Sequence, residues 1–207
     1  HAPPPLTPDE RAMIGLAAVA DPPWLAAALQ RAWGDDAPAE RAALQGRAPL
    51  DLRVNTLKAT RDQALEKLSE DGVIAEPLEL TGTALRVLAG GVDVDNSEAF
   101  RLGFVEVQDA GSQIAAAALQ VHPGESVLDL CAGAGGKTLA LAAAMENAGR
   151  LLACDTGAVR LKRIAGRAAR AGATLIETRL LADDWLDRPA PFGETFDAVL
   201  VDAPCSG

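Results

Sequence analysis

The sequence predicts an α/β protein in which a parallel sheet follows a small α+β unit and a short helical lead-in. Two observations lead to this fold class. After residue 108, apolar strand-like segments alternate with helical segments, which is the pattern of a sheet wound by β-α-β units. Before it, short strand-like segments are broken by glycines and an acidic turn, which indicates a small α+β domain. We therefore expect three parts, residues 1–49, 50–107 and 108–207.

The first two parts contain clear start and stop signals. Pro22 and Pro23 mark a helix start in the lead-in, and large apolar residues follow it near helical spacing. In the small unit, residues 51–58 alternate apolar and polar side chains as a half-buried strand does. Thr60 and Gln63 form a capping-box pair, and Gly72 stands where that helix should end. Further strands are expected at 73–80, 84–88 and 103–107.

The third part has the order expected of a parallel sheet. Asp109 and Ser112 are placed to cap an alanine-rich helix that runs to about residue 120. Strands are then expected at 126–131, 150–155 and 174–181, and a last one within 196–207, with helices in the first two intervals. In such sheets, ligands bind at the carboxyl ends of the strands.

Composition and charge restrict the class of protein. The 207 residues carry 19 basic and 29 acidic side chains, a net charge of −10, and only 3% are aromatic. We therefore expect neither bulk electrostatic coating of nucleic acid nor a base-stacking surface. No apolar run approaches the roughly 18 residues of a membrane helix, and the start lacks the order of a signal peptide. A cytoplasmic protein without a membrane partner is expected, and three dispersed cysteines predict neither disulfides nor a metal site.

A glycine-rich turn joins the first strand of the third part to its helix, from Asp129 to Thr138. A phosphate-binding P-loop would need glycine where Cys131 stands, and a dinucleotide-binding turn would need glycine in place of Thr138. What remains is the Asp-x-x-x-Gly-x-Gly turn, with Gly133 and Gly135, that is typical of Rossmann-like class I methyltransferases binding S-adenosylmethionine. The alternative is a strand-to-helix turn with no ligand.

Acidic residues follow the next two strands. Asp155 ends the second strand, where a carboxylate can accept the ribose hydroxyls of an adenosyl cofactor, although a helix cap is the alternative. Asp183 and Asp184 follow the third strand, where the same architecture uses an acid for the adenine amino group. A solvated acidic turn is the other interpretation of that pair.

A basic stripe is predicted on the helix after Asp155. Arginines recur there at steps of three and four residues, so they share one helix face: Arg160, Arg163, Arg167 and Arg170. Residues 150–179 have a net charge of +5, which leaves −15 for the rest of the chain. The stripe is a candidate for contact with an RNA backbone, and a solvated helix face is the alternative.

The last strand leads into Asp202 and Cys205, an acid and a cysteine facing the cofactor turn. These are the ingredients of pyrimidine C5 methylation, in which a thiolate adds at C6 while an acid holds N3. The base must leave its stack to be reached. The alternative for Cys205 is a small packed residue, and Cys131 and Cys154, within apolar segments, fit that interpretation better.

Five segments together resemble the bacterial Sun/Fmu (RsmB-like) ribosomal RNA cytosine-C5 methyltransferases. They are LRVNTLK (52–58), VQDAGSQ (107–113), VLDLCAGAGGKT (127–138), ACD (153–155) and FDAVLVDAPCSG (196–207). The resemblance implies that the small unit is an RRM-like RNA-contacting subdomain. It also implies a cofactor site of Cys131, Ala132, Gly133, Gly135, Gly136, Lys137, Asp155, Asp183 and Asp202, with Asp202 and Cys205 facing the target base.

The chain departs from that family in two ways. The family's usual loop reads CAAPGGKT, and here Gly133 and Ala134 replace Ala-Pro, which loosens the turn. The family's nucleophile is generally a second cysteine in a downstream Thr-Cys-Ser motif, while the Pro-Cys cysteine assists product release. The sequence ends at Gly207, before such a motif, so we expect a truncated chain with an incomplete sheet.

The leading hypothesis is S-adenosylmethionine-dependent methylation of cytosine C5 in RNA, with ribosomal RNA as the expected substrate and a monomer as the expected state of the full-length protein. Two alternatives stay open. A nucleotide hydrolase would use Gly136, Lys137 and Thr138 with Asp202 as a metal-binding acid. A non-catalytic RNA-binding fragment or assembly factor would keep the fold without turnover.

Overall fold

The computed structural model describes residues 22–44, 48–90, 94–182, 184–185, 192 and 195–203. The chain divides into two compact units, His1–Ala48 and Pro49–Gly207, which we describe separately. Within the described ranges, no helix is both long and apolar enough to cross a membrane. Asp183 and Cys205, two of the predicted site residues, lie outside the described residues.

The first unit is helical in its described part. It contains α2 (Pro23–Trp33), the short 3-10 helix η1 (Gly34–Asp36) and α3 (Ala37–Leu44). Pro22 is the N-cap of α2 and Pro23 its first residue, where a missing N–H costs nothing because that donor has no partner within a helix. The helix start predicted at this proline pair is therefore confirmed.

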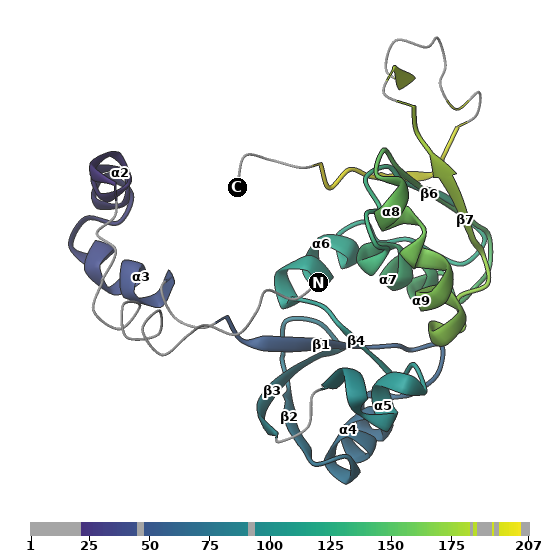
Figure 1. The fold of residues 1–207 in the computed structure, drawn as a ribbon, viewed down its shortest axis with the longest axis horizontal. Coiled ribbons are helices and arrows are strands. Elements are labelled where there is room, and N and C mark those ends of the chain that lie inside the picture. Colours follow the sequence, from purple (N-terminus) through teal and green to yellow (C-terminus); the bar gives the residue numbers. More distant parts are fainter. Residues whose placement is uncertain are drawn as a thin grey trace. The chain divides into compact units, whose positions relative to one another are not determined.

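The second unit begins with a four-stranded antiparallel sheet in the order β2-β3-β1-β4 (Figure 1). Its elements are β1 (Leu50–Val54), α4 (Arg61–Glu70), β2 (Val73–Pro77), β3 (Ala84–Gly90), η2 (Val94–Asn96), α5 (Glu98–Arg101) and β4 (Val105–Val107). This β-α-β-β-α-β order is the ferredoxin-like arrangement, so the predicted small α+β unit is confirmed. The first strand stops at Val54, before the predicted end, because the Asn55 carbonyl accepts the amides of Lys58 and Ala59 and turns the chain.

The capping signals of the small sheet act as predicted, with one exception. Thr60 and Gln63 form a reciprocal capping box on α4, and Gly72 follows that helix with a φ of 77°. Helix α5 was not predicted. Its start is signalled by Ser97, whose hydroxyl accepts the amide of Phe100, but only four residues of helix follow it.

The rest of the second unit carries a parallel sheet in the order β7-β6-β5-β8. Its elements are α6 (Ala110–Ala117), β5 (Ser126–Asp129), α7 (Gly136–Ala144), β6 (Arg150–Asp155), α8 (Ala158–Leu161), α9 (Arg163–Ala171), β7 (Ile176–Leu180) and β8 (Ala198–Leu200). Asp109 caps α6 through the amide of Ser112, as predicted. All three strand pairs are parallel, and the α/β class predicted for this part is confirmed.

Helices α7 and α9 cover one face of the parallel sheet (Figure 1). Leu139 and Leu141 of α7 and Ala168 of α9 share a buried cluster with Val127 and Leu151. On the opposite face, Leu128, Leu152 and Cys154 pack with partly buried aromatic residues of the chain that follows β7: Trp185, Phe192 and Phe196. The sheet is thus apolar on both faces, as a parallel sheet is expected to be.

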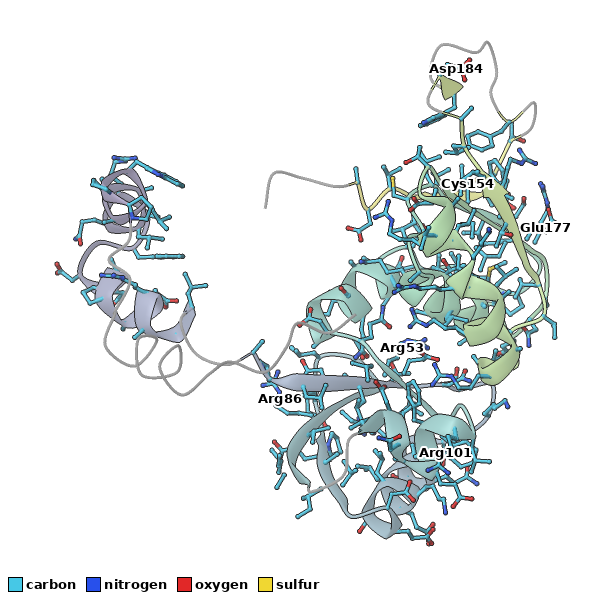
Figure 2. The ribbon with its side chains drawn as sticks, viewed as in Figure 1. Arg53, Arg86, Arg101, Cys154, Glu177 and Asp184 are labelled. Atoms are coloured by element: carbon cyan, nitrogen blue, oxygen red, sulfur yellow. The ribbon has the colours of Figure 1, made fainter. Side chains whose placement is uncertain are left out.

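Strand β1 is buried on both faces, although its alternating sequence predicted one solvated face. Leu52 and Val54 belong to the apolar core of the small sheet. Asp51, Arg53 and Asn55 are also buried, because this second face meets α6 and α9, and Figure 2 shows Arg53 rising from β1 toward the helices. The Asn55 amide donates to the carbonyl of Ala171 at 2.8 Å, so it ties β1 to the end of α9.

Candidate active site

The glycine-rich turn between β5 and α7 is shaped by local hydrogen bonds. Gly133 and Gly135 have φ values of 56° and 87°, in the left-handed region that favours glycine. The Gly135 amide donates to the Ala132 carbonyl at 2.8 Å and closes the turn. A side chain at position 135 would also meet Ile164, since its Cβ would lie 2.9 Å from Ile164 Cγ1. Position 135 therefore needs glycine for its backbone conformation and for the space beside Ile164, whereas Gly133 has open space around it.

A first cavity of about 280 Å³ opens between this turn and the end of β6. Five of the predicted site residues line it: Cys131, Ala132, Gly133, Asp155 and Asp202. Sequence analysis missed others, among them Leu181 and Trp185, which supply an apolar wall. Their position just after β7 in the chain was the available signal, because the carboxyl ends of parallel strands meet at one edge.

Asp155 is buried at the end of β6 and already accepts three hydrogen bonds. Its Oδ2 accepts the Gly133 amide at 2.7 Å, and its Oδ1 accepts the Gly157 amide at 2.6 Å and Arg160 Nη2 at 2.8 Å. The carboxylate thus organises the turn and the start of α8, and it also borders the first cavity. Its predicted contact with a ribose stays a prediction.

A second cavity of about 270 Å³ lies on the other side of the turn. Gly136 and Lys137 line it, together with Gln108, Asp109 and Asp129. Gln108 and Asp109 precede α6, and the spacing of the glycine motif gave no signal for them. Three residues line both cavities and form a shared wall: Cys131, Ala132 and Asp202.

The side chains of the Gly-Lys-Thr segment are engaged by protein carboxylates. Lys137 Nζ lies 2.5 Å from Asp202 Oδ2, which brings these two predicted residues together at the second cavity. The buried Thr138 hydroxyl donates to Asp129 Oδ2 at 2.7 Å. In a P-loop the same lysine and hydroxyl would face phosphates and a magnesium ion, so this arrangement argues against the nucleotide hydrolase.

Asp129 has an unusual environment for a carboxylate. It is 1% exposed, and among the described residues no donor meets its Oδ1 atom. Burial raises its pKa to about 6, against the lowering effect of the Thr138 hydroxyl and Lys137. Since this residue lines the second cavity, a cationic group bound there would find an acceptor with no competing partner.

The two described cysteines are poorly suited to act as nucleophiles. Partial burial raises the pKa of the Cys131 thiol above its usual value, and the neighbouring Asp155, Asp129 and Asp202 raise it further. A thiolate is therefore disfavoured at Cys131. Cys154 is fully buried in β6. Both observations agree with the packing roles predicted for them.

Comparison with known proteins places both parts of the chain in one group. A family model described as "16S rRNA methyltransferase RsmB/F" matches residues 116–207. The ferredoxin-like domain of the same RsmF/B-like methyltransferases matches residues 21–95. The chain belongs to the RsmB/F family.

Relatives and solved structures agree with membership of the RsmB/F family. Ribosomal RNA small subunit methyltransferase B of Pseudomonas syringae pv. tomato is 36% identical over 90% of this chain and 41% of its own length. A mouse 28S rRNA (cytosine-C(5))-methyltransferase is 37% identical over 77% of this chain and 20% of its own length. A crystal structure of a methyltransferase homolog from Pyrococcus horikoshii is 26% identical, with a TM-score of 0.81 over 98% of this chain and 65% of that one. The chain therefore spans about four tenths of the length of the bacterial relative.

The predicted basic stripe of this RsmB/F chain needs correction. Arg167 and Arg170 do not form a solvated face or an open RNA contact, because both bind the buried Glu106 of β4. Arg160 is paired with Asp155 at the first cavity, while Arg163 is exposed. Arg167 and Arg170 share a side of α9, as periodicity predicted, whereas Arg160 lies on the separate short helix α8. Periodicity gave no information on which element packs there.

Proposed function

We propose that this protein takes part in S-adenosylmethionine-dependent methylation of cytosine C5 in RNA, with ribosomal RNA as substrate. The observation that supports it best is the pair of cavities that share Cys131, Ala132 and Asp202 as a wall. A methyl donor with its ribose at Asp155 in the first cavity and its ammonium group at Asp129 in the second would pass this wall, where Asp202 would face the base. The relatives named above as ribosomal RNA methyltransferases support the choice of substrate.

The loop residues fit a cofactor of this kind. S-adenosylmethionine, when bound, supplies a methyl group on a sulfonium ion, and its methionine part carries an ammonium group. The Oδ1 of Asp129, which meets no donor in the described part of the chain, is an acceptor suited to that ammonium. We assign the loop residues Cys131, Ala132, Gly133, Gly135, Gly136 and Lys137 to the cofactor site, with Asp155 at the ribose and Asp183 near the adenine.

The chemistry on the base requires an acid and a thiolate. A thiolate adds to C6 of cytosine while N3 takes a proton from an acid, and electron density moves to C5. Carbon 5 then forms a bond to the methyl group, whose former bonding pair stays on the sulfonium sulfur. Loss of the C5 proton to a base and cleavage of the C6–S bond restore the thiolate and release 5-methylcytosine.

We assign the acid at N3 to Asp202 and a cysteine role to Cys205. Lys137, at 2.5 Å from the Asp202 carboxylate, would fix the orientation of that acid toward the base. Cys205 serves either as the attacking thiolate or in product release, with a further cysteine of the full-length protein as nucleophile in the second case. The two roles make different predictions for covalent trapping.

We further propose that residues 50–107 contact RNA, that residues 108–207 bind the cofactor, and that residues 1–49 are a helical lead-in. Because ribosomal RNA is the proposed substrate, the reaction is assigned to the cytoplasm, and the full-length protein is expected to work as a monomer. RNA contacts must come from local basic patches, since the chain carries a net charge of −10.

Calorimetric titration with S-adenosylmethionine tests the cofactor site. We expect saturable binding, a loss of about tenfold or more in affinity for Asp155→Ala, and no change for the exposed Asp62→Ala on α4. The absence of binding to the folded chain would refute the proposal. An assay for transfer of a labelled methyl group to ribosomal RNA distinguishes the enzyme from a non-catalytic RNA-binding factor, because such a factor would transfer no label.

Trapping with an RNA that contains 5-fluorocytosine separates the two roles of Cys205. Fluorine at C5 cannot leave as a proton does, so the attacking cysteine stays bonded to C6. If Cys205 is the nucleophile, Cys205→Ser abolishes the adduct. An adduct that persists in Cys205→Ser assigns the attack to another cysteine.

A further inference from the structure

The turn that forms the cofactor loop is held from two different elements. From β6, the Cys154 carbonyl accepts the Ala132 amide at 2.8 Å and the Asp155 carboxylate accepts the Gly133 amide at 2.7 Å. The next residue, Ala134, is held from α9 instead. Its carbonyl oxygen accepts Arg167 Nη1 at 2.8 Å.

Arg167 makes a second contact with the other arm of its guanidinium group. Nη2 donates to Oε2 of Glu106 at 2.8 Å, and Glu106 is a residue of β4 that is only 2% exposed. One planar group therefore joins the cofactor loop to the small antiparallel sheet. A lysine has a single ammonium group and no such fork, so it is poorly suited to reach both acceptors at once.

Ala134 is the position of the turn where such an anchor matters most. It lies between Gly133 and Gly135, both at positive φ, and it has no ring to fix its own φ as proline would. Glycines on both sides allow the Ala134 peptide to rotate at low cost. Without the Arg167 contact, a ligand that needs the observed loop shape would have to order this peptide on binding.

We propose that Arg167 is a positioning residue that fixes the shape of the cofactor loop by bridging the Ala134 carbonyl to Glu106 of the small sheet. The inference rests on the proposed function, because S-adenosylmethionine is the ligand assigned to this loop. Arg167 is not among the residues assigned to contact the cofactor. Its second contact lies on the small antiparallel sheet, whose proposed role is to contact RNA. The loop shape is thereby tied to the position of that sheet.

Arg170 provides a matched control on the same helix. It binds the other oxygen of Glu106 at 2.5 Å, and its guanidinium lies 3.5 Å from the centre of the Phe100 ring. Its Nη1 donates to the Phe100 carbonyl at 3.2 Å, away from the loop. Arg167→Lys and Arg170→Lys therefore disturb the same carboxylate, but only the first removes an anchor of Ala134.

The test compares these two variants in calorimetric titrations with S-adenosylmethionine. We expect the Kd to rise about tenfold in Arg167→Lys, the cost of ordering one backbone residue, and to change less than twofold in Arg170→Lys. Melting temperatures should fall in both. An equal Kd in the two variants overturns the positioning role, whereas absence of binding to the unmodified chain overturns the proposed function instead.

Amide hydrogen exchange without any ligand gives a second, independent readout. Exchange at residues 132–136 should accelerate in Arg167→Lys and stay at the unmodified rate in Arg170→Lys. Unchanged exchange of the loop in Arg167→Lys overturns the inference even if cofactor binding is never observed. At saturating cofactor, kcat for methyl transfer should be unaffected in Arg167→Lys. The contact between Arg167 and Ala134 is expected to change the affinity for the cofactor, and therefore KM alone.

Discussion

Two buried carboxylates in different regions of the molecule have opposite surroundings. Glu106, between the small sheet and α9, is 2% exposed and accepts Arg167 and Arg170, one on each oxygen. Asp129, at the cofactor turn, is 1% exposed, and one of its oxygens meets no donor among the described residues. Burial raises the pKa of Asp129 to about 6. Glu106 thus has a cation on each oxygen, whereas Asp129 has the Thr138 hydroxyl on Oδ2 and, among the described residues, no donor on Oδ1.

The difference separates a structural charge from a candidate binding charge. A buried carboxylate with a cation on each oxygen stabilises the contact between two parts of the fold, and it has little capacity left for a ligand. A buried carboxylate with an empty acceptor lowers the stability of the ligand-free protein and favours a ligand that supplies a cation. Substitutions at the two sites should therefore change stability in opposite directions.

The largest effect is expected at Glu106. Glu106→Ala leaves Arg167, Arg170 and the neighbouring buried Arg53 without their shared countercharge, and the free energy of unfolding should fall by about 3–5 kcal/mol. Burial lowers the pKa of Arg53 to about 10, so its guanidinium stays charged at neutral pH. Urea denaturation measures the change. The matched control is Glu177→Gln, an exposed partner of Arg150, which should cost less than about 1 kcal/mol. Equal effects would contradict the comparison.

The second prediction concerns Asp129 and has the opposite sign. Its folded pKa of about 6 lies above the usual 3.8, so the folded state holds the extra proton between these values and stability falls as pH rises from about 4 to 6. Asp129→Asn removes this dependence. It should stabilise the ligand-free protein by up to about 3 kcal/mol at pH 8 and by little below pH 4.

Cofactor binding distinguishes this account of Asp129 from a purely structural one. In the unmodified chain, affinity for S-adenosylmethionine should rise with pH through 6, since the ammonium group pairs with the ionised carboxylate. Asp129→Asn should bind about tenfold less tightly and lose this pH dependence. Urea denaturation and calorimetry at several pH values measure both effects. If Asp129→Asn is less stable than the unmodified protein at pH 8, Oδ1 of Asp129 has a hydrogen-bond donor and this account is wrong.

The smallest of the three effects is expected at Asp51, an intermediate case. This buried carboxylate on β1 accepts Arg86 at 2.8 Å and the Ala110 amide at 3.3 Å, and the Arg86 hydrogen bond holds its pKa below the usual value. Its contribution is therefore present above about pH 4 and is lost as pH falls below that. Asp51→Asn should cost about 1.5 kcal/mol at pH 7 and progressively less as the pH falls below about 4. If the cost of Asp51→Asn in free energy of unfolding does not change with pH, ionisation of Asp51 is excluded as its source.

The sequence identified the parts of the site that depend on local structure and on parallel-sheet topology. Gly133 and Gly135 both have positive φ, which favours glycine, so their pattern indicated the turn directly. Asp155 could be placed near that turn because neighbouring parallel strands end at the same edge of a sheet. Thr60, Gln63 and Asp109 act within four residues of their own positions, and the expected caps are all present.

Features that depend on packing between distant segments could not be predicted in the same way. Alternation in β1 predicted a solvated face for Asp51 and Arg53, and the structure buries both under helices that come much later in the chain. Periodicity placed Arg167 and Arg170 on one helix side, but Glu106 lies more than 60 positions earlier. Asp183 and Cys205, outside the described residues, remain predictions from motif alone.

The wall shared by the two cavities has a consequence for the order of events in the proposed reaction. Cys131, Ala132 and Asp202 contact whatever fills either cavity, so occupancy of one side changes the surroundings of the other. Any such influence is reciprocal. If the bound donor raises the affinity for the base, the bound base raises the affinity for the donor by the same factor. The demethylated product of S-adenosylmethionine would bind at the same wall as S-adenosylmethionine itself. Release of the modified RNA and exchange of the donor are then linked events, and product inhibition should depend on which of the two leaves first.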